Sequence, residues 1–549
     1  MWDRHDTHDV FNQTPPFGNV NLVAADQPLL DALKANCVGP NGADLIAFGK
    51  AWGTAERLDL GRLANENPPK LRTHDARGYR IDAIEFHPAY HALMRASMAD
   101  GLHASTWDET DSAHPVGKGH VARAARLYTA AGVESGHVCP MTMTHASVAA
   151  LAAAPERLSV WLPMIRSRDY DSRFIPFWEK SAITLGMGMT EKQGGTDVRA
   201  NTTRAVPASG DEYTLTGHKW FMSAPMCDAF LVLAQAPRGL TCFLMPRFRP
   251  DGSLNAIHLQ RLKDKLGNRS NASSEVELDD AFAWRIGEES HGVRTIINMV
   301  QLTRLDCAVA SAGLARMGLA QAMHNARHRS VFQRKLIEQP AMQAVLADLA
   351  IENEAMTALA MRTARSFDLA ARDEHEAAYA RLVTPAAKFG ICKAAPRLIY
   401  EAMECLGGNG YVEESALPRL YREAPVNAIW EGSGNVIALD ILRAENREPE
   451  VAASVLERLM DDAGDLPGAS DTARDIVLAL QSSQAEAKVR FIAERLFTLA
   501  AAAALARSAP PQITEAYALT RLVQPARMPG ANDLGDALKP LLERSFVTM

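Results

Sequence analysis

The spacing of apolar positions divides the 549-residue chain into a helical stretch, a stranded stretch and a second helical stretch. Alanine-rich segments at 120–133 and 144–154 predict helices in the first third. Helical periodicity returns at 293 and continues in blocks at about 340–370 and 376–405. Between them, short apolar or alternating runs predict strands at 185–189, 213–221, 230–234, 241–245, 256–259 and 275–278.

This order predicts an α+β chain built from several domains, because a chain of this length exceeds a single hydrophobic core. We expect an N-terminal helical domain at 1–180 and a small central β-barrel or sandwich at 181–290. A C-terminal four-helix bundle at 291–445 and a helical extension at 446–549 complete the expected organisation.

The helix that begins at 293 carries a polar interruption on its predicted apolar stripe. The stripe consists of Val293, Ile297, Val300, Cys307, Ala310, Leu314 and Met317. Thr303 and Arg304 fall in its gap, and a guanidinium on an apolar face is costly unless it is paired. Arg304 therefore either extends to solvent at the helix edge or faces a cavity or a ligand.

Net charge, cysteine content and the length of apolar runs argue against several classes of function. The net charge of −7 gives no general attraction to nucleic acid or anionic membrane. Seven cysteines without a CxxC pair predict free thiols in a reducing compartment, and we expect no metal site. No apolar run is long enough to span a bilayer, and the N-terminus does not resemble a signal peptide, so we expect a cytoplasmic protein.

Two glycine-containing motifs carry the candidate chemistry. The first, MGMTEKQGGTDV at 187–198, predicts a strand followed by a loop that presents hydroxyls to a polar, planar ligand, or simply a tight turn. The second, NAIWEGSGN at 427–435, places Glu431 among apolar and small residues. A carboxylate there suits a general base. The alternative is an acid that favours the N-terminus of a helix.

A third group of residues is basic. Arg327, Arg329, Arg334 and Lys335 surround Phe332, and Arg419 and Arg422 follow the Gly407-Gly408 turn. Such clusters suit diphosphates, although they also occur on solvated helix faces.

Taken in order, these motifs resemble the acyl-CoA dehydrogenase superfamily over residues 180–445. The matching pieces are TEKQGGTD (190–197), GHKWFMS (217–223), RSVF (329–332) on a helix, ECLGGNGY (404–411) and IWEGSGN (429–435). Lys192-Gln193 stands where catabolic members have Pro after Thr-Glu. That departure and the stretches at 8–13, 53–69 and 261–273 resemble a subgroup associated with the response to DNA alkylation.

The resemblance implies an FAD cofactor and an oligomer, with a homotetramer as the usual form. Arg329, Phe332 and the Gly407-Gly408 turn would reach the FAD of a neighbouring subunit, with Gln333 in place of the usual Gly. The other implied FAD contacts are Met187, Thr190, Thr196, Phe221, Met222, Ser223, Ile429, Trp430, Gly432, Ser433, Gly434, Asn435 and Leu439.

The resemblance also implies a catalytic role for Glu431, which aligns with the base that removes the acyl α-proton while the β-hydride passes to flavin N5. Thr303 occupies the alternative base position of some branched-chain members and cannot serve. Arg304 corresponds to the substrate-side arginine. Arg443, twelve residues after Glu431, is a candidate to reach that carboxylate and weaken activity.

The subgroup implies double-stranded DNA binding through the C-terminal helices. Residues 446–549 hold 11 basic and 14 acidic side chains, whereas residues 487–549 hold 8 and 5. Only the terminal part therefore gives modest support. We expect an FAD protein of the alkylation response with weak, isovaleryl-CoA-type dehydrogenase activity. A catabolic acyl-CoA dehydrogenase and a non-enzymatic DNA-binding flavoprotein are the alternatives.

Overall fold

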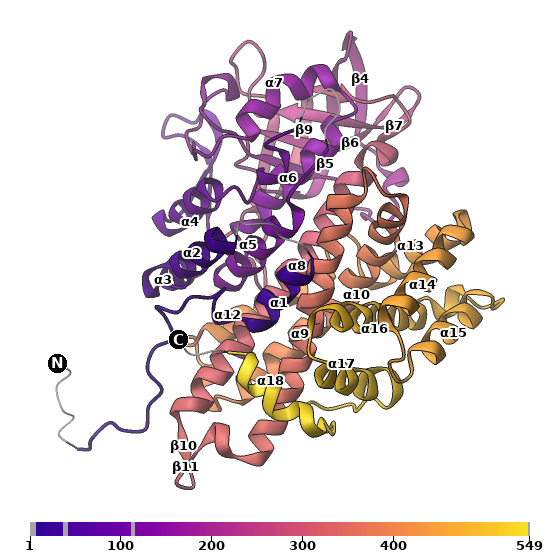
Figure 1. Cartoon of the computed structure of the whole chain (residues 1–549). Coiled ribbons are helices and arrows are strands. Elements are labelled where there is room, and N and C mark those ends of the chain that lie inside the picture. Colours follow the sequence, from indigo (N-terminus) through magenta and orange to yellow (C-terminus); the bar gives the residue numbers. More distant parts are fainter. Residues whose placement is uncertain (1–6, 37–41, 111–115, 547–549) are drawn as a thin grey trace.

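The computed structural model describes residues 7–36, 42–110 and 116–546. Long helices run through the centre of the molecule, with a β-sheet region at one end and the C-terminal helices along one side (Figure 1). The N-terminal segment extends away from this body as an arm. No helix among the described residues is both long enough and apolar enough to cross a membrane.

The first third is helical, with one hairpin that the apolar pattern did not reveal. Its short strands, β1 (Lys70–His74) and β2 (Arg80–Glu85), are antiparallel and mostly polar. The helices are α1 (Gln27–Ala35), α2 (Gly42–Trp52), α3 (Ala55–Glu66), α4 (Pro88–Ala99), α5 (His120–Val133), α6 (Val138–Leu151) and α7 (Pro155–Ile165). Helix α6 begins upstream of the predicted 144–154 because Pro140 is tolerated in its first turn.

The central sheet has seven strands, and its pairings form a closed ring. The strand order is β3-β5-β4-β6-β7-β9-β8, with additional β3–β6 and β5–β9 pairings. The strands are β3 (Leu185–Gly188), β4 (Arg204–Ser209), β5 (Glu212–Ser223), β6 (Ala229–Ala236), β7 (Gly239–Pro246), β8 (Ile257–Leu262) and β9 (Ser273–Ile286). The sequence pattern missed β4 because that strand is almost entirely exposed and contains Pro207.

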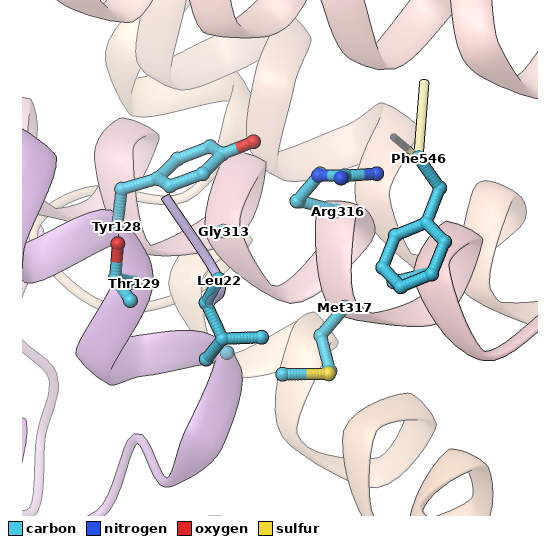
Figure 2. A pocket seen from close by; sticks show the side chains of 9 residues that line it. Leu22, Tyr128, Thr129, Gly313, Arg316, Met317 and Phe546 are labelled. Atoms are coloured by element: carbon cyan, nitrogen blue, oxygen red, sulfur yellow. The ribbon is translucent and has the colours of Figure 1, made fainter. Parts of the chain in front are cut away.

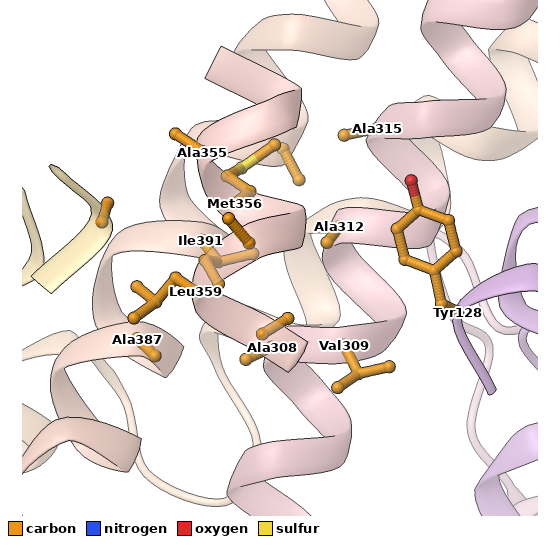
Figure 3. Close-up of a cluster of buried hydrophobic side chains, with 14 of the residues drawn as sticks. Tyr128, Ala308, Val309, Ala312, Ala315, Ala355, Met356, Leu359, Ala387 and Ile391 are labelled. Atoms are coloured by element: carbon orange, nitrogen blue, oxygen red, sulfur yellow. The ribbon is translucent and has the colours of Figure 1, made fainter. Parts of the chain in front are cut away.

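Three long helices form the core of the second helical region: α8 (Gly292–His328), α9 (Pro340–Leu369) and α10 (Glu374–Glu404). Figure 3 shows how alanines on their facing sides let the backbones approach while larger apolar side chains fill the remaining space. The buried side chains drawn there include Ala308, Ala312, Met356, Leu359 and Ile391. Short elements α11 (Gly408–Tyr411), α12 (Ala416–Glu423) and α13 (Gly434–Arg447) follow.

The predicted stripe on α8 is wrong over its first turns. Val293 and Ile297 are exposed, at 38% and 40%, whereas Ile296 and Met299 are buried. At this end α8 packs against the sheet, and the buried Ile296, Met299 and Leu302 join the apolar cluster of the β domain. The direction in which a helix faces a sheet is a tertiary property that the spacing of apolar residues leaves open.

The C-terminal extension packs against the main bundle. It consists of α14 (Pro449–Ala463), α15 (Ala469–Leu480), α16 (Val489–Ser508), α17 (Pro511–Tyr517) and α18 (Leu538–Arg544). Helix α16 lies so close to α10 that a Cβ on Gly390 would meet the Phe497 ring at 2.1 Å. Arg521 bonds Asp348 at 2.6 Å, and Arg544 bonds Glu354 at 2.8 Å, so ion pairs also fix the extension to α9.

A small cavity lies where the two ends of the chain meet the bundle. Tyr128 of α5, Arg316 and Met317 of α8, Leu22 and Phe546 line it (Figure 2). The Arg316 guanidinium donates to Asp26 Oδ2 at 2.7 Å and to the Ala25 carbonyl at 3.0 Å. These contacts link the N-terminal segment to α8, and we assign the cavity a structural role.

The six cysteines of the described residues, Cys139, Cys227, Cys242, Cys307, Cys392 and Cys405, are free and buried. This agrees with the predicted free thiols, and Cys37 lies outside the described residues. Within the described ranges, no group of His, Cys, Asp and Glu side chains is arranged to hold a metal ion.

Three histidines around α5 and α6 make stability depend on pH. Burial, with Arg123 nearby, lowers the pKa of His103 and of His120 to about 3, and lowers the pKa of His145 well below 6.5. Below pH 6.5 the unfolded chain therefore binds more protons than the folded one, so stability is lost as the pH falls from about 6.5 toward 3.

We expect the free energy of unfolding to fall by on the order of 2 kcal/mol per buried histidine between pH 6.5 and 5. Denaturant titrations at several pH values measure this slope. His120, whose neighbours are the rings of Trp107, His145 and Phe367, offers a matched variant. His120→Phe should flatten the slope, and an unchanged slope in this variant would contradict the assignment.

Candidate functional site

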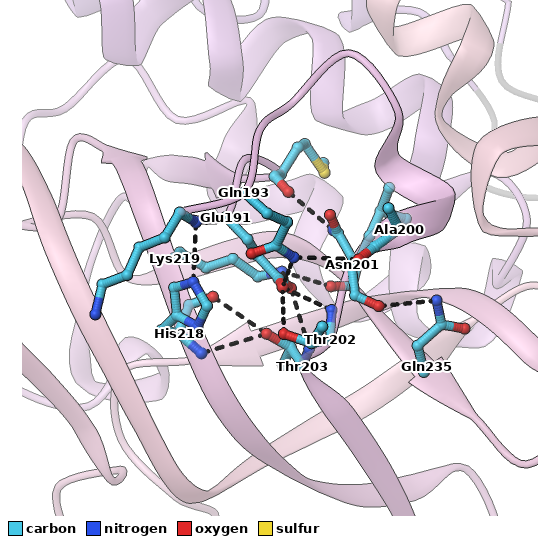
Figure 4. A network of polar contacts seen from close by, with 12 residues as sticks. Glu191, Gln193, Ala200, Asn201, Thr202, Thr203, His218, Lys219 and Gln235 are labelled. Atoms are coloured by element: carbon cyan, nitrogen blue, oxygen red, sulfur yellow. Dashed lines mark hydrogen bonds and ion pairs between the residues drawn. The ribbon is translucent and has the colours of Figure 1, made fainter.

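The loop after β3 is anchored by a buried carboxylate (Figure 4). Glu191 is fully buried and accepts a hydrogen bond from Lys219 Nζ of β5 at 2.9 Å. It also accepts the backbone amides of Thr202 at 2.7 Å and Thr203 at 3.2 Å. Burial alone would raise the pKa of Glu191. The Lys219 ammonium and the donors outweigh that effect and hold the pKa well below its usual range.

This anchor sets the shape of the glycine-containing loop. Gly194 has a φ of +135°, and a Cβ on Gly195 would lie 2.2 Å from Thr190 Oγ1, so both positions require glycine. Gln193 donates to Glu191 Oε2 at 2.8 Å and to the Ala200 carbonyl at 3.2 Å. The Lys192-Gln193 departure thus supplies an extra anchor. Thr190 is half-buried and Thr196 is exposed at the rim of the loop.

Strand β5 brings a second predicted segment beside this loop. Met187 of β3 pairs with Ser223 of β5. Along β5 the side chains alternate, so Phe221 is 49% exposed, Met222 is fully buried and Ser223 is half-buried. Phe221 and Ser223 therefore face the open side of the sheet, whereas Met222 has only its backbone available there.

The Glu431 loop is held by groups from two helices. Glu431 has a φ of +57° and Gly432 one of +110°, and the loop is fixed by donors to its carbonyls. Lys388 Nζ of α10 donates to the Trp430 carbonyl at 2.9 Å and also to the Gly432 carbonyl. Arg304 Nε of α8 donates to the Glu431 carbonyl at 3.1 Å. A backbone held in this sparsely populated region is typical of a functional loop.

The Glu431 carboxylate is half-buried and reaches α8. Its Oε2 accepts a hydrogen bond from Thr303 Oγ1 at 2.7 Å, while Oε1 accepts no hydrogen bond from the described residues. The neighbouring Trp430 packs at the edge of the apolar cluster that contains Met187 and Met222. Trp430 thus places the Glu431 loop against the apolar cluster to which the strands of the central sheet contribute.

Arg304 lies between the Glu431 loop and α13. It is 6% exposed, so it does not extend to solvent, and its Nη1 pairs with Asp440 of α13 at 2.5 Å. Because Nε also donates to the Glu431 carbonyl, the guanidinium connects the loop to α13. Arg304 thus positions Glu431, and a direct contact with substrate would have to use its remaining amino group.

Among the described residues, no hydrogen bond or ion pair joins Arg443 to Glu431. Arg443 is exposed on α13, whose buried face consists of Gly434, Ile437, Ala438 and Ile441. Helix α13 begins at Gly434, so Glu431 lies outside it, and helical spacing does not relate the two side chains. Leu439, on the same helix, is half-buried against the main core.

The expected helix at RSVF is also wrong. Helix α8 ends at His328, and β10 (Ser330–Val331) and β11 (Arg334–Lys335) form a hairpin. Phe332 and Gln333 form its tip with positive φ values, and the Phe332 side chain is 93% exposed. Arg329 Nη1 donates to the Asn12 carbonyl of the N-terminal arm at 3.0 Å.

Within one chain this hairpin lies at the opposite end from the central sheet (Figure 1). Arg329 and Phe332 are therefore not brought to the site formed by the sheet and the Glu431 loop. The Gly407-Gly408 turn, at the start of α11, is exposed as well. Contact of Arg329 and Phe332 with a flavin at that site would thus have to come from a second subunit.

Sequence reasoning missed the lysines and the second arginine around the Glu431 loop. Lys388 is 1% exposed, and Lys393 follows five residues later on α10. Arg490 of α16 donates from Nη1 to Asn435 Oδ1 at 2.9 Å. Lysines in the apolar block VTPAAKFGICKAAP carried the same signal as Arg304, a cation among apolar residues.

Comparison with known proteins identifies the family. The adaptive response protein AidB N-terminal domain matches residues 12–172, and the middle and C-terminal domains of acyl-CoA dehydrogenase match 186–281 and 290–445. The AidB protein of Escherichia coli (strain K12) is 46% identical over 512 residues, covering 93% of this chain and 94% of that protein. The chain belongs to the acyl-CoA dehydrogenase family.

Solved structures of acyl-CoA dehydrogenases agree. The crystal structure of Caenorhabditis elegans ACDH-11 in complex with C11-CoA has a TM-score of 0.84 at 28% identity, covering 96% of this chain and 95% of that one. An acyl-CoA dehydrogenase of Bacillus anthracis, complexed with FAD, shares the fold with a TM-score of 0.67 at 16% identity, over 97% of this chain and 89% of that one. The predicted α+β fold of this family is confirmed.

FAD is the cofactor of this family, and the residues present here fit it. The loop at 190–196 offers two hydroxyls, and Gly195 leaves no side chain between Thr190 and an approaching ligand. The half-exposed ring of Phe221 provides an apolar surface beside Ser223 on β5. The acyl-CoA dehydrogenase family thus accounts for the polar loop, the exposed aromatic ring and the adjacent carboxylate.

Thr303 is expected to position the base of this acyl-CoA dehydrogenase. Thr303→Val keeps the shape but removes the hydroxyl that bonds Glu431 Oε2, so we expect about a tenfold lower rate of flavin reduction. Thr303→Ser should restore most of the rate. Stopped-flow flavin absorbance separates the limiting rate from acyl-CoA affinity, and a change in affinity alone would exclude the positioning role.

Proposed function

We propose that this protein dehydrogenates an acyl-CoA thioester at the Cα–Cβ bond, with Glu431 as the base that removes the α-proton. The observation that carries the proposal is the carboxylate itself. One oxygen of Glu431 is held by Thr303, and the other is not bonded by a described residue. A carboxylate that is oriented through one oxygen and free at the other is arranged to accept a proton.

Each supporting group has a defined task in this proposal. Lys388 and Arg304 fix the carbonyls on both sides of Glu431, which prevents the strained loop from relaxing. Thr303 fixes the rotation of the carboxylate. FAD, when bound, supplies the hydride acceptor for the β-carbon. The proton ends on Glu431, and the hydride leaves the substrate with the electron pair, so that a double bond remains.

We further propose that the protein serves the cytoplasmic response to DNA alkylation, with weak activity on isovaleryl-CoA-type substrates. The similarity to E. coli AidB over nearly the whole length supports this assignment. Anaerobic titration of the flavin absorbance with isovaleryl-CoA and straight-chain acyl-CoAs tests it. Fast, complete bleaching by a straight-chain substrate would favour a catabolic enzyme, and no bleaching with any acyl-CoA would favour a non-enzymatic flavoprotein.

Binding of double-stranded DNA is the part of this proposal with least support from the charges. Several C-terminal arginines are engaged in ion pairs: Arg495 with Asp475, Arg507 with Asp462, Arg521 with Asp348 and Glu352, and Arg544 with Asp31 and Glu354. Phosphate contacts then depend on other cations or on several subunits together. Retention of a labelled duplex, measured against salt concentration, gives the number of such contacts.

We also propose that the protein is a homotetramer. Its support is the pair of exposed aromatic residues in the motifs that the family uses between subunits: Phe332 at 93% and Tyr411 at 80%. Both rings are available for contact with a neighbouring subunit. Light scattering of the purified flavoprotein gives the mass, and a monomer that retains FAD would exclude this arrangement.

A further inference from the structure

Three cations converge on the loop that carries Glu431. Lys388 and Lys393 come from α10, and Arg490 comes from α16 in the C-terminal extension. Lys388 bonds the loop carbonyls, and Arg490 Nη1 bonds Asn435 Oδ1 at 2.9 Å. The Phe389 ring lies beneath the other two, 5.2 Å from Lys393 Nζ and 5.6 Å from Arg490 Cζ.

These cations have no acidic partner. Within the part of the chain that the structure describes, none of the three is paired with a carboxylate, although most buried or half-buried arginines of this protein are. Partial burial lowers the pKa of Lys393, and the charges of Arg490 and Lys388 lower it further. Like charges held together without a counter-charge leave a positive potential that an anion would neutralise.

Lys393 and Arg490 both lie close to Gly434, at the start of α13. A Cβ at this position would lie 2.9 Å from Lys393 Nζ and 3.5 Å from Arg490 Nη1. Any side chain on residue 434 would therefore displace the ammonium. The preceding Ser433 makes no side-chain hydrogen bond to the first turn of α13, so that turn adds amide donors to the same space.

We propose that Lys393 and Arg490 bind the diphosphate of FAD, so that the C-terminal extension contributes directly to cofactor binding. This inference rests on the proposed flavin site, because it places the diphosphate beside the Glu431 loop. A diphosphate carries the charge that balances two cations, and guanidinium and ammonium groups are its usual ligands. Of the three cations, only Arg490 lies outside residues 186–445, which match the acyl-CoA dehydrogenase domains.

Flavins with different numbers of phosphates test the proposal. The apoprotein is titrated with FAD, FMN and riboflavin, and binding is followed by quenching of flavin fluorescence. We expect Arg490→Gln and Lys393→Gln each to weaken FAD binding about 10- to 100-fold, as expected for a charge-assisted hydrogen bond. Riboflavin binding should be unchanged, and Arg490→Lys should retain part of the FAD affinity.

Arg447→Gln is the matched control. Arg447 is exposed in the last turn of α13 and forms no hydrogen bond or ion pair with the described residues. Its replacement changes the net charge by the same amount as Arg490→Gln. It should bind FAD as the unchanged protein does. A thermal unfolding curve for each apoprotein separates a loss of phosphate contacts from a loss of folding, because a folding defect would weaken riboflavin binding too.

Other outcomes would overturn the inference. Unchanged FAD affinity in both variants, or an equal loss for riboflavin, would exclude a diphosphate contact. Weaker acyl-CoA binding with normal FAD binding would assign the cations to CoA, and weaker duplex retention alone would assign them to DNA. If the unchanged protein takes up no FAD, the proposed function fails. If the unchanged protein takes up FAD and the Arg490 and Lys393 variants bind FAD equally tightly, this inference alone fails.

Discussion

Glu431→Gln is expected to slow flavin reduction by acyl-CoA by about 10³-fold, within the range for loss of a general base. Glutamine has nearly the same shape, and its amide oxygen can still accept the hydrogen bond from Thr303. It cannot take the α-proton. The variant should therefore keep its FAD and bind acyl-CoA normally, which distinguishes a chemical defect from a structural one.

Anaerobic stopped-flow measurements of the flavin absorbance give this rate. Glu431→Asp provides a graded control, because it keeps the carboxylate but moves it away from the substrate. Its rate of flavin reduction should lie between the rates of the unchanged protein and of Glu431→Gln. Glu431 already holds a positive φ of 57°, so neither replacement adds backbone strain. Reduction of the Gln variant at close to the original rate would show that another group is the base.

Lys219→Met is expected to cost about 3–5 kcal/mol of stability, because it leaves the buried Glu191 carboxylate without its counter-charge. Both side chains of this pair are fully buried. The variant also loses the hydrogen bond from Lys219 Nζ to the Leu233 carbonyl, at 2.7 Å. Because the pair fixes the loop at 190–203, the FAD content should fall together with the free energy of unfolding.

Chemical denaturation of the apoprotein measures the loss, and absorbance gives the FAD content. The double variant Glu191→Gln/Lys219→Met is the control, since it removes both charges and should be more stable than Lys219→Met alone. Lys192→Met, at an exposed position on the same loop, should change little. A single variant as stable as the unchanged protein would show that the ion pair does not anchor the loop.

The strands of the central sheet could be predicted from the sequence because their side chains alternate or form short apolar runs between turn residues. Strand β4 could not, because it is almost entirely exposed, and neither could the hairpin β1–β2, whose residues are mostly polar and only partly buried. The Phe332 hairpin was assigned to a helix for a related reason. Its strands have two residues each, too few to show an alternating pattern in the sequence. Its turn depends on the positive φ values of Phe332 and Gln333.

The residues of the candidate site likewise divide into those that local motifs predict and those that only the packing reveals. Glu431, the TEKQGGTD loop and β5 are contiguous motifs, so their residue types and order pointed to a flavin site. The partners of Glu431 lie 128 residues away at Thr303 and 127 residues away at Arg304. Thr303 was considered only as a base, and its role as a hydrogen-bond donor to Glu431 emerged from the packing of α8 against the loop.

By itself, the sequence determined the family, the elements with clear periodicity and the carboxylate that the chemistry requires, because these are recorded in local residue types and spacing. Only the tertiary structure decided that Arg304 pairs with Asp440, that Arg443 faces solvent and that Arg490 reaches Asn435. Each of these depends on the rotation and approach of separate helices. Packing of many distant side chains sets those quantities, and no local pattern encodes them.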